Sequence, residues 1–174
     1  MQIACLDLEG VLVPEIWINV ARKTGIDALL ATTRDVPDYD VLMTRRLRIL
    51  DEHGLKIGDI EEVIESLGPL EGAAEFLDWL RSEFQVVILS DTFYEFAKPL
   101  MRQLGWPALF CHRLGIAPDG RVEAYHHISM LAEADRGILF RPPQNVVDEF
   151  PQFPVATDYA GLREAFLEAR ADLE

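Results

Sequence analysis

An apolar run at the start of the chain ends in two carboxylates, and this feature constrains the fold most strongly. Residues 3–6 read Ile-Ala-Cys-Leu, and Asp7-Leu8-Glu9-Gly10 follows before a second apolar stretch. Side chains alternate between the two faces of a strand, so Asp7 and Glu9 are expected to point the same way, about 7 Å apart. Carboxylates so placed suit a divalent cation such as Mg²⁺, and an aspartate at a strand end can act as a nucleophile. The alternative is that the acidic pair only ends the strand at a turn.

A second apolar run also ends in polar residues. Residues 86–89 read Val-Val-Ile-Leu and lead into Ser90, Asp91 and Thr92 before a helical pattern. Ligands of open α/β sheets bind outside the carboxyl ends of the strands, so Ser90 and Asp91 are predicted to meet the two earlier carboxylates in one crevice. Ser90 and the N–H groups of the following helix would hold phosphate oxygens there. The alternative is that Ser90 or Asp91 simply caps that helix.

Strand-like and helical patterns alternate along the chain, which predicts an α/β fold with a mostly parallel sheet. Three helical patterns follow one another without a strand between the two motifs, the third opened by a capping box at residues 59–62. This organisation predicts a small helical cap over residues 14–69, inserted into a core formed by residues 1–13 and 70–174.

The C-terminal half is predicted to complete the core. The pattern indicates a hairpin over residues 112–125, with a turn at Pro118-Asp119-Gly120. Residues 138–140 are expected to form the last strand, and Asp158 is expected to cap a final helix that runs to Asp172.

Composition excludes several classes of protein. The formal charge is −14, from 30 acidic and 16 basic residues, which argues against nucleic acid as a partner. No apolar stretch is long enough to span a membrane, and no basic region precedes the first apolar run, so that run is not expected to be a signal peptide. Cys5 and Cys111 are expected to be reduced core residues. These features predict a cytoplasmic domain.

The two motifs resemble the first two motifs of the haloacid dehalogenase-like phosphatases. The likeness is greatest to those members that act on phosphoserine and can transfer its phosphate to homoserine, and it rests on residues 6–17, 37–40, 46–54 and 89–96. The resemblance implies a Rossmann-like core with a helical cap. It also implies an aspartyl-phosphate on Asp7, a general acid and base at Glu9, and Mg²⁺ held by both residues.

The same resemblance assigns the substrate contacts. Glu15 and Arg46 match positions that hold the amino and carboxylate groups of phosphoserine, and Ser90 and Asp91 match the phosphate-binding segment. For Glu15 and Arg46 the alternative is a surface salt bridge. The implied reaction transfers the phosphate of phosphoserine to water or to homoserine.

A block of the family pattern is absent from this chain. Relatives carry a phosphate-binding Lys and then a strand ending in a Gly-Asp-Ser-x-x-Asp motif, whose first acid completes the metal site. Here Tyr125 is followed directly by His126 and His127, and a segment of roughly thirty residues, about one βαβ crossover, is missing. Asp119, Glu133 and Asp135 are the nearby acids that could substitute. The alternative function is therefore a truncated, catalytically impaired member that retains the fold and weak ligand binding.

The missing strand would lie beside the first strand, so its loss exposes a sheet edge. Unpaired backbone groups at such an edge are unfavourable if buried, and an open edge invites pairing with another chain. Two arrangements are predicted: the strand at residues 138–140 moves in beside the first strand, or two chains pair across the edge as a homodimer.

Overall fold

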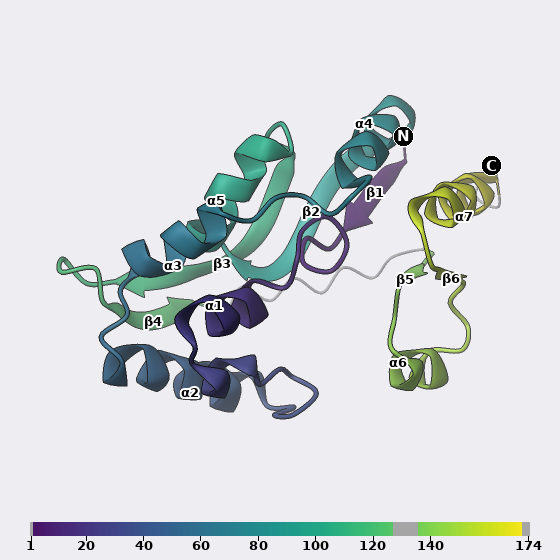
Figure 1. Cartoon of the computed structure of the whole chain (residues 1–174). Helices are drawn as coiled ribbons and strands as arrows, with labels where there is room; N and C mark the ends of the chain where they lie inside the picture. The colour runs from purple at the N-terminus through teal and green to yellow at the C-terminus, as the bar shows by residue number, and fades with distance from the viewer. Residues whose placement is uncertain (1, 127–135, 172–174) are drawn as a thin grey trace.

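The computed structural model describes residues 2–126 and 136–171. Its main sheet has the order β1-β2-β3-β4, in which β1, β2 and β3 are parallel and β4 is antiparallel to β3 (Figure 1). A separate parallel pair, β5 and β6, lies toward the C-terminus. The predicted α/β class with a mostly parallel sheet is confirmed. The strands are β1 (Ile3–Leu6), β2 (Gln85–Phe93), β3 (Ala108–Ile116), β4 (Val122–His126), β5 (Leu139–Phe140) and β6 (Val155–Ala156).

The helices follow local signals in the sequence. The Asp38 carboxylate accepts a hydrogen bond from the Val41 N–H (3.0 Å) and caps α2, and Asp158 accepts from the Gly161 N–H (2.8 Å) at the start of α7, as predicted. The helices are α1 (Ile16–Thr24), the 3₁₀ turn η1 (Asp27–Leu30), α2 (Tyr39–Glu52), α3 (Ile57–Glu65), α4 (Ala73–Glu83), α5 (Tyr94–Gln103), α6 (Gln144–Glu149) and α7 (Tyr159–Ala171). The consecutive helices α1, α2 and α3 lie between β1 and α4; the cap boundaries at 14–69 stay a prediction.

Two predicted elements are placed differently. Helix α3 begins at Ile57, before the predicted capping residue Asp59. Asp59 lies in the first turn of the helix, and its carboxylate accepts a hydrogen bond from the Lys56 N–H (2.8 Å). The strand at residues 138–140 is not the last one, since β6 follows it. That strand also does not move beside β1: β5 pairs with β6, and Leu139 donates its N–H to the Pro154 carbonyl (2.9 Å).

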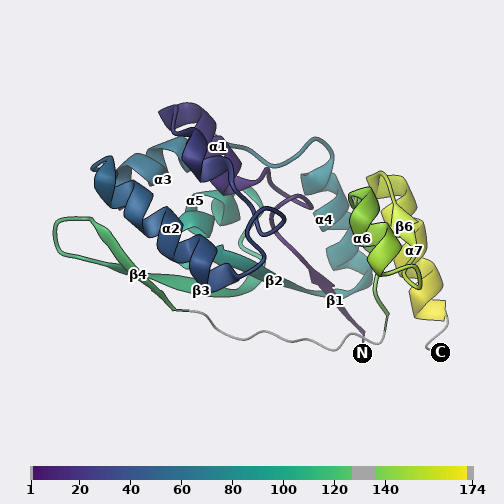
Figure 2. The ribbon, with the colours of Figure 1, turned by 90° about the horizontal axis from the view of Figure 1, so that it is seen from below.

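Aromatic packing joins the C-terminal helix to the core. Helix α7 lies beside α4 (Figure 2), where the Phe76 and Tyr159 rings stack at 5.0 Å and the Phe84 and Phe166 centroids are 5.7 Å apart. Such ring pairs add stabilisation beyond the apolar area they bury. The segment that carries β5, α6, β6 and α7 is therefore anchored through α4, which leaves the outer edge of β1 free of β5.

The two cysteines are free, but only Cys111 is buried. Cys5 is exposed, contrary to the expectation that both lie in the core, because the odd-numbered residues of β1 face away from the buried side that holds Ala4 and Leu6. Among the residues described, no helix is long and apolar enough to cross a membrane.

Candidate active site

A tight loop after β1 holds the two carboxylates. The Leu12 N–H donates to the Leu8 carbonyl (2.9 Å) and the Gly10 N–H donates to the Val13 carbonyl (2.8 Å). Gly10 has φ +75°, a conformation that costs other residues strain and suits glycine. Leu8, Leu12 and Val13 are fully buried and fix the loop to the core. The loop is therefore rigid, and it presents Asp7 at the end of β1.

The strand register brings the second motif to the same edge. Leu6 lies opposite Ile88 in the parallel β1-β2 pair, so the residues that follow each strand position emerge side by side. Ser90 is buried, and its side chain is near enough to the Asp7 carboxylate to lower the pKa of that carboxyl, although burial raises it more. The structure thus brings Asp7 and Ser90 together, as the sequence predicts.

Neither Ser90 nor Asp91 caps the next helix, because β2 continues to Phe93 and α5 begins at Tyr94. The first N–H groups of α5, which were predicted to hold phosphate oxygens together with Ser90, begin four residues after Ser90. Asp91 points to the opposite face of the strand from Ser90, where its side chain is largely exposed and lies 3.3 Å from Nε2 of the buried His112.

Both carboxylates of the loop have raised pKa values. Glu9 Oε2 accepts a hydrogen bond from the Ile16 N–H at the start of α1 (2.8 Å), yet burial outweighs this bond and raises the pKa of Glu9 to about 7. Asp7 Oδ1 accepts from the Leu8 N–H (2.6 Å). Surrounding protein atoms displace water from part of the Asp7 carboxylate and raise its pKa, and the charges of Asp91 and Glu15 act in the same direction.

Arg46 is a buried cation beside these acids. Its guanidinium lies 4.6 Å from the Trp17 ring centroid, and Nη2 donates to the Ala31 carbonyl (2.9 Å). Burial lowers the pKa of Arg46 to about 10, and the carboxylates of Glu9 and Glu15 oppose that shift. The alternative of a surface salt bridge is wrong for Arg46, which is 8% exposed. Arg46 Nε has no hydrogen-bond partner within the described part of the chain.

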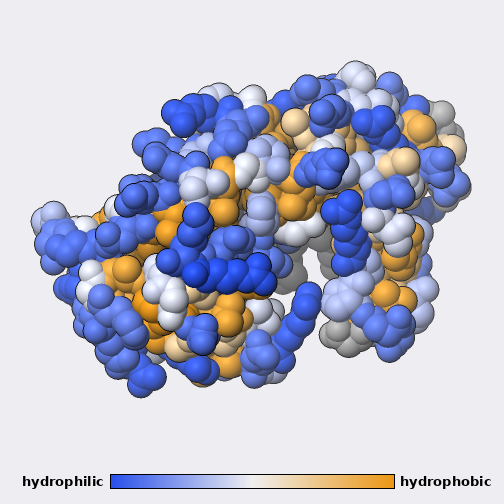
Figure 3. Space-filling view, in the orientation of Figure 1, coloured by the Kyte–Doolittle hydropathy of each residue, from blue (hydrophilic) through white to orange (hydrophobic). Residues whose placement is uncertain are grey.

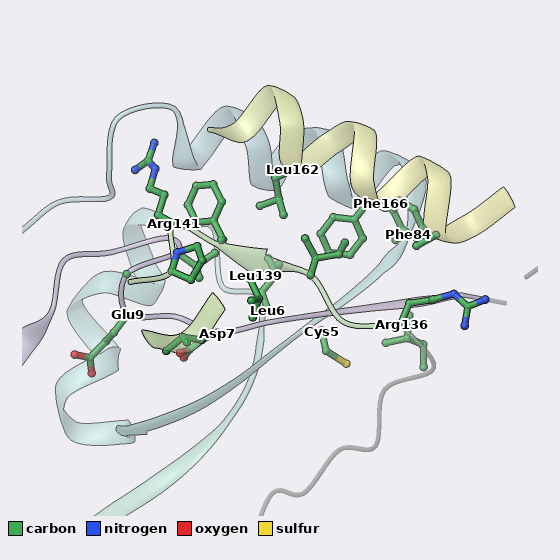
Figure 4. A pocket seen from close by; sticks show the side chains of 18 of the residues that line it. Cys5, Leu6, Asp7, Glu9, Phe84, Arg136, Leu139, Arg141, Leu162 and Phe166 are labelled. Atoms are coloured by element: carbon green, nitrogen blue, oxygen red, sulfur yellow. The ribbon is translucent and has the colours of Figure 1, made fainter. Parts of the chain in front are cut away.

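Glu15 is exposed and precedes α1 without capping it through its side chain. Its carboxylate lies over the Gly10 turn, where a Cβ on Gly10 would be 3.8 Å from Glu15 Oε1. Asp7, Glu9 and Glu15 together line one end of a cavity of about 630 Å³ (Figure 4). Ser90, Asp91 and Arg46 are not part of its lining.

The donor set of the loop suits a hard divalent cation. Asp7 and Glu9 each use one oxygen for a backbone N–H, and each keeps a second oxygen for other ligands. Burial is the main cause of their raised pKa values and neighbouring carboxylates add to it; a bound cation would favour the ionised forms of both groups. Two carboxylates with water and a substrate phosphate are a usual Mg²⁺ shell.

Of the acids considered as replacements, Asp119 is the one that lies in the described part of the chain, and it does not complete this site. Asp119 lies at the tip of the β3-β4 hairpin, where its carboxylate accepts from the Arg121 N–H (3.1 Å). Glu133 and Asp135 lie outside the described residues. Across residues 2–126 and 136–171, no group of three or more His, Cys, Asp or Glu side chains is placed to hold a metal ion.

Sequence reasoning missed two residues at the rim of the site. The Tyr39 hydroxyl donates to the Asp91 carbonyl (3.3 Å), and its ring contacts His112 at a centroid distance of 6.0 Å. Burial raises the pKa of Tyr39. A histidine inside an apolar strand run was a usable signal for His112. Tyr39 lies in the segment 37–40 on which the resemblance rests, but nothing in the sequence placed it at the site, because its position depends on how α2 packs on the sheet.

A parallel sheet with two carboxylates at its carboxyl edge, and with helices inserted after the first strand, is the arrangement of a class of hydrolases. The chain belongs to the haloacid dehalogenase-like hydrolase family, whose family model matches residues 1–136. The resemblance seen in the two sequence motifs is confirmed.

Individual relatives are closely similar along the whole chain. The chain is 59% identical over 198 aligned positions to phosphoserine phosphatase ThrH of Pseudomonas aeruginosa, covering 97% of each protein. It is 56% identical to a phosphoserine phosphatase of Pseudomonas syringae pv. tomato, covering 97% of this chain and 84% of the other. The alignment is longer than the 174 residues of this chain, so the relatives have at least 24 residues without a counterpart here.

Solved structures show the same fold at lower sequence identity. A phosphoserine phosphatase in apo form superposes with a TM-score of 0.56 at 23% identity, over 70% of this chain and 58% of that one. A haloacid dehalogenase family hydrolase from Salmonella enterica serovar Typhi gives 0.58 at 18% identity, over 90% and 53%. The chain spans little more than half the length of these two proteins.

Proposed function

We propose that this chain is a Mg²⁺-dependent phosphatase that acts on phosphoserine through an aspartyl-phosphate on Asp7. The observation that supports this most is the placement of Asp7, at a strand end beside Ser90 on a loop fixed to the core, in a chain 59% identical to a phosphoserine phosphatase. Asp7 and Glu9 would hold the Mg²⁺, which supplies positive charge that lowers the pKa of Asp7 and offsets the charge of the phosphate.

The proposed reaction has two steps. In the first, the Asp7 carboxylate attacks phosphorus, the bond to the serine oxygen breaks, and Glu9 donates its proton to that oxygen. In the second, Glu9 as a carboxylate takes a proton from water, which attacks the aspartyl-phosphate to release inorganic phosphate and restore Asp7. Glu9 would thus act as the acid in the first step and as the base in the second.

The remaining site residues would bind substrate. The Ser90 hydroxyl and nearby backbone would hold the phosphate, and Asp91 belongs to the same segment. Arg46, buried and cationic, would pair with the substrate carboxylate through its planar fork. Glu15, whose carboxylate faces the same turn as Glu9, would hold the substrate ammonium group.

The test is Mg²⁺-dependent phosphate release from phosphoserine by the purified chain and by Asp7→Asn. We expect the substitution to lower kcat by at least about 10³-fold, because it removes the nucleophile. Asp119→Asn is the matched control, since that carboxylate lies on the hairpin tip, and its kcat should be unchanged. Equal rates for Asp7→Asn and the unaltered chain would contradict the proposal.

The choice of acceptor is tested in the same assay. With homoserine added, its hydroxyl can replace water in the second step, and phosphohomoserine would then accumulate at the expense of inorganic phosphate. ³¹P NMR of the reaction mixture distinguishes the two products. Phosphate alone at saturating homoserine would show that water is the acceptor.

A second function, the impaired member that binds but does not turn over, is favoured by one observation. The relatives have at least 24 more residues, and the described part of this chain provides no third metal-binding acid. Calorimetry with phosphoserine distinguishes the two functions: binding by a folded chain that releases no phosphate supports the impaired member.

A further inference from the structure

The cavity beside the active site continues between two strands that do not pair with each other. Its walls come from β1 and its flanking residues on one side, and from residues 138–143, α6 and α7 on the other. In the space-filling view the molecule is hollowed between the part that carries α1 and α2 and the part that carries β5 and α6 (Figure 3). Figure 4 shows Cys5 of β1 on one side of the cavity, with Leu162 and Phe166 of α7 on the other.

The backbone of β1 turns half of its polar groups into this cavity. The Gln85 N–H donates to the Gln2 carbonyl (3.3 Å), and Ile3 is the partner of Gln85 in the parallel register. In a parallel ladder this alternation directs the N–H and C=O of Ala4 toward β2 and those of Ile3 and Cys5 away from it. Ile3 and Cys5 both line the cavity and are exposed. Within residues 2–126 and 136–171 no strand pairs with the outer side of β1, so in this part of the chain it is an open edge with a regular strand pattern.

The backbone of β5 mirrors this arrangement. Leu139 and Arg141 donate their N–H groups to the carbonyls of Pro154 (2.9 Å) and Ala156 (2.8 Å) in and next to β6. The residues between and before them, Ile138 and Phe140, therefore turn their backbone groups away from β6, and both line the cavity. Two strand edges thus face one slot from opposite sides.

The slot has the size and chemistry for one extended segment. Its volume of about 630 Å³ is within the range of ligand pockets. Its inner wall is apolar, formed by residues such as Leu139, Leu162 and Phe166, and four arginines also line it although the chain carries a net charge of −14. Those arginines are Arg34, Arg136, Arg141 and Arg170.

We propose that this slot binds an extended peptide strand in trans, which is apolar at alternate positions, carries acidic residues only at the end away from Asp7, Glu9 and Glu15, and joins β1 to β5 into one sheet. The length of the relatives supports this occupant, since they have at least 24 residues, enough for a strand and its connections, that this chain lacks. Added strands bind through backbone hydrogen bonds to an open edge, with side-chain pockets that set specificity.

The probe is a synthetic peptide that spans the residues of the Pseudomonas aeruginosa relative with no counterpart in this chain. We expect it to bind the full chain with 1:1 stoichiometry in calorimetry, and to slow hydrogen exchange in the segments that contain residues 3–6 and 138–141. A scrambled peptide of the same composition should do neither. Exchange is measured without substrate or Mg²⁺, so failure of the phosphatase proposal leaves this test intact.

A proline in β1 makes the test specific for the edge. Cys5→Pro removes an N–H that faces the slot and none that faces β2, a position at which proline is tolerated in an edge strand. It should weaken peptide binding about tenfold, whereas Cys5→Val, which keeps the N–H, should bind like the unaltered chain. If circular dichroism shows that Cys5→Pro does not fold, Ile3→Pro replaces it, since its N–H also faces the slot.

Three results would overturn the proposal. The first is absence of peptide binding by the folded chain. The second is binding without slower exchange at either strand edge. The third is a dimer, shown by light scattering, in which residues 3–6 are already protected without peptide, because a second copy would then occupy the edge.

Discussion

Glu9 links the chemistry of the loop to the stability of the fold. Its carboxylate accepts from the Ile16 N–H, and burial raises its pKa from the usual 4.5 to about 7. The native state therefore holds this proton up to about pH 7, whereas the unfolded chain releases it near 4.5. The stabilising contribution of protonated Glu9 is complete below pH 4.5 and is lost as the pH rises through 7.

We therefore expect the free energy of unfolding, measured by urea titration in EDTA, to fall by on the order of 2 kcal/mol between pH 5 and pH 8 because of Glu9. Glu9→Gln cannot ionise, so it should lack this part of the pH dependence. The difference between the two proteins isolates Glu9 from Asp7, whose pKa is also raised. Identical pH profiles for both proteins would contradict the assignment.

Arg46 tests the proposed recognition of the substrate carboxylate. Arg46→Lys keeps the charge but loses the planar fork and the stacking on Trp17, so the KM for phosphoserine should rise about tenfold with a smaller change in kcat. Arg48→Lys on the same helix is the control, because its side chain is 69% exposed and pairs only with Glu52 in i,i+4 geometry. An equal KM for the two variants would remove Arg46 from the substrate site.

At the scale of elements, the β3-β4 hairpin fastens the inserted helices to the sheet. The Ile57 N–H donates to the Gly120 carbonyl (2.9 Å), and the Lys56 ammonium donates to the Asp119 carbonyl (2.9 Å). At the other end of the hairpin the Tyr125 hydroxyl donates to the Asp40 carboxylate. These contacts join the start of α2 and the start of α3 to one hairpin, so they hold α2 over the site edge.

We expect Tyr125→Ala to loosen this attachment, because it removes a hydrogen bond and the ring contact with Tyr39 at 5.9 Å. Hydrogen exchange in α2 should become faster while exchange in α7 stays unchanged. Tyr125→Phe keeps the ring and should show a smaller effect, with a loss of about 0.5–1 kcal/mol in stability. Faster exchange throughout the protein would indicate general destabilisation instead.

At the scale of the whole molecule, the charge of −14 opposes an anionic substrate. Salt screens this repulsion, since the Debye length falls from about 30 Å at 0.01 M to about 8 Å at 0.15 M. We expect the KM for phosphoserine to fall about threefold when KCl is raised from 10 to 150 mM, with little change in kcat, in steady-state assays at fixed Mg²⁺. A KM that rises with salt would show that the local cations, not the net charge, dominate approach.

Much of this molecule follows from local patterns. The apolar runs at residues 3–6 and 86–89 predicted two parallel strands, and their polar ends predicted where Asp7 and Ser90 meet. Capping chemistry predicted the start of α7 at Asp158. These features depend on a few neighbouring residues, and parallel pairing then places the strand ends together.

The predicted start of α3 was wrong for a local reason, because Asp59 can cap a helix either from the position before it or from within its first turn. The predicted pairing of β5 with β1 was wrong for a reason that involves the whole molecule. A two-residue strand contains too little pattern to choose between β1 and β6, and the aromatic packing of Tyr159 and Phe166 on α4 decides where that segment lies. The place of His112 and Tyr39 at the site likewise depends on tertiary packing, because their neighbours come from distant segments of the chain.

The sequence by itself determined the fold class, the family and the residues at the ends of the first two central strands, because alternation of side chains and strand chemistry are local properties. Only the tertiary structure decided that β5 pairs with β6, that Arg46 is buried beside the acids, and that two strand edges face one slot. The physical reason is that strand pairing and burial depend on how separate elements pack. Because this chain lacks a segment that its relatives have, that packing cannot be inferred from the relatives.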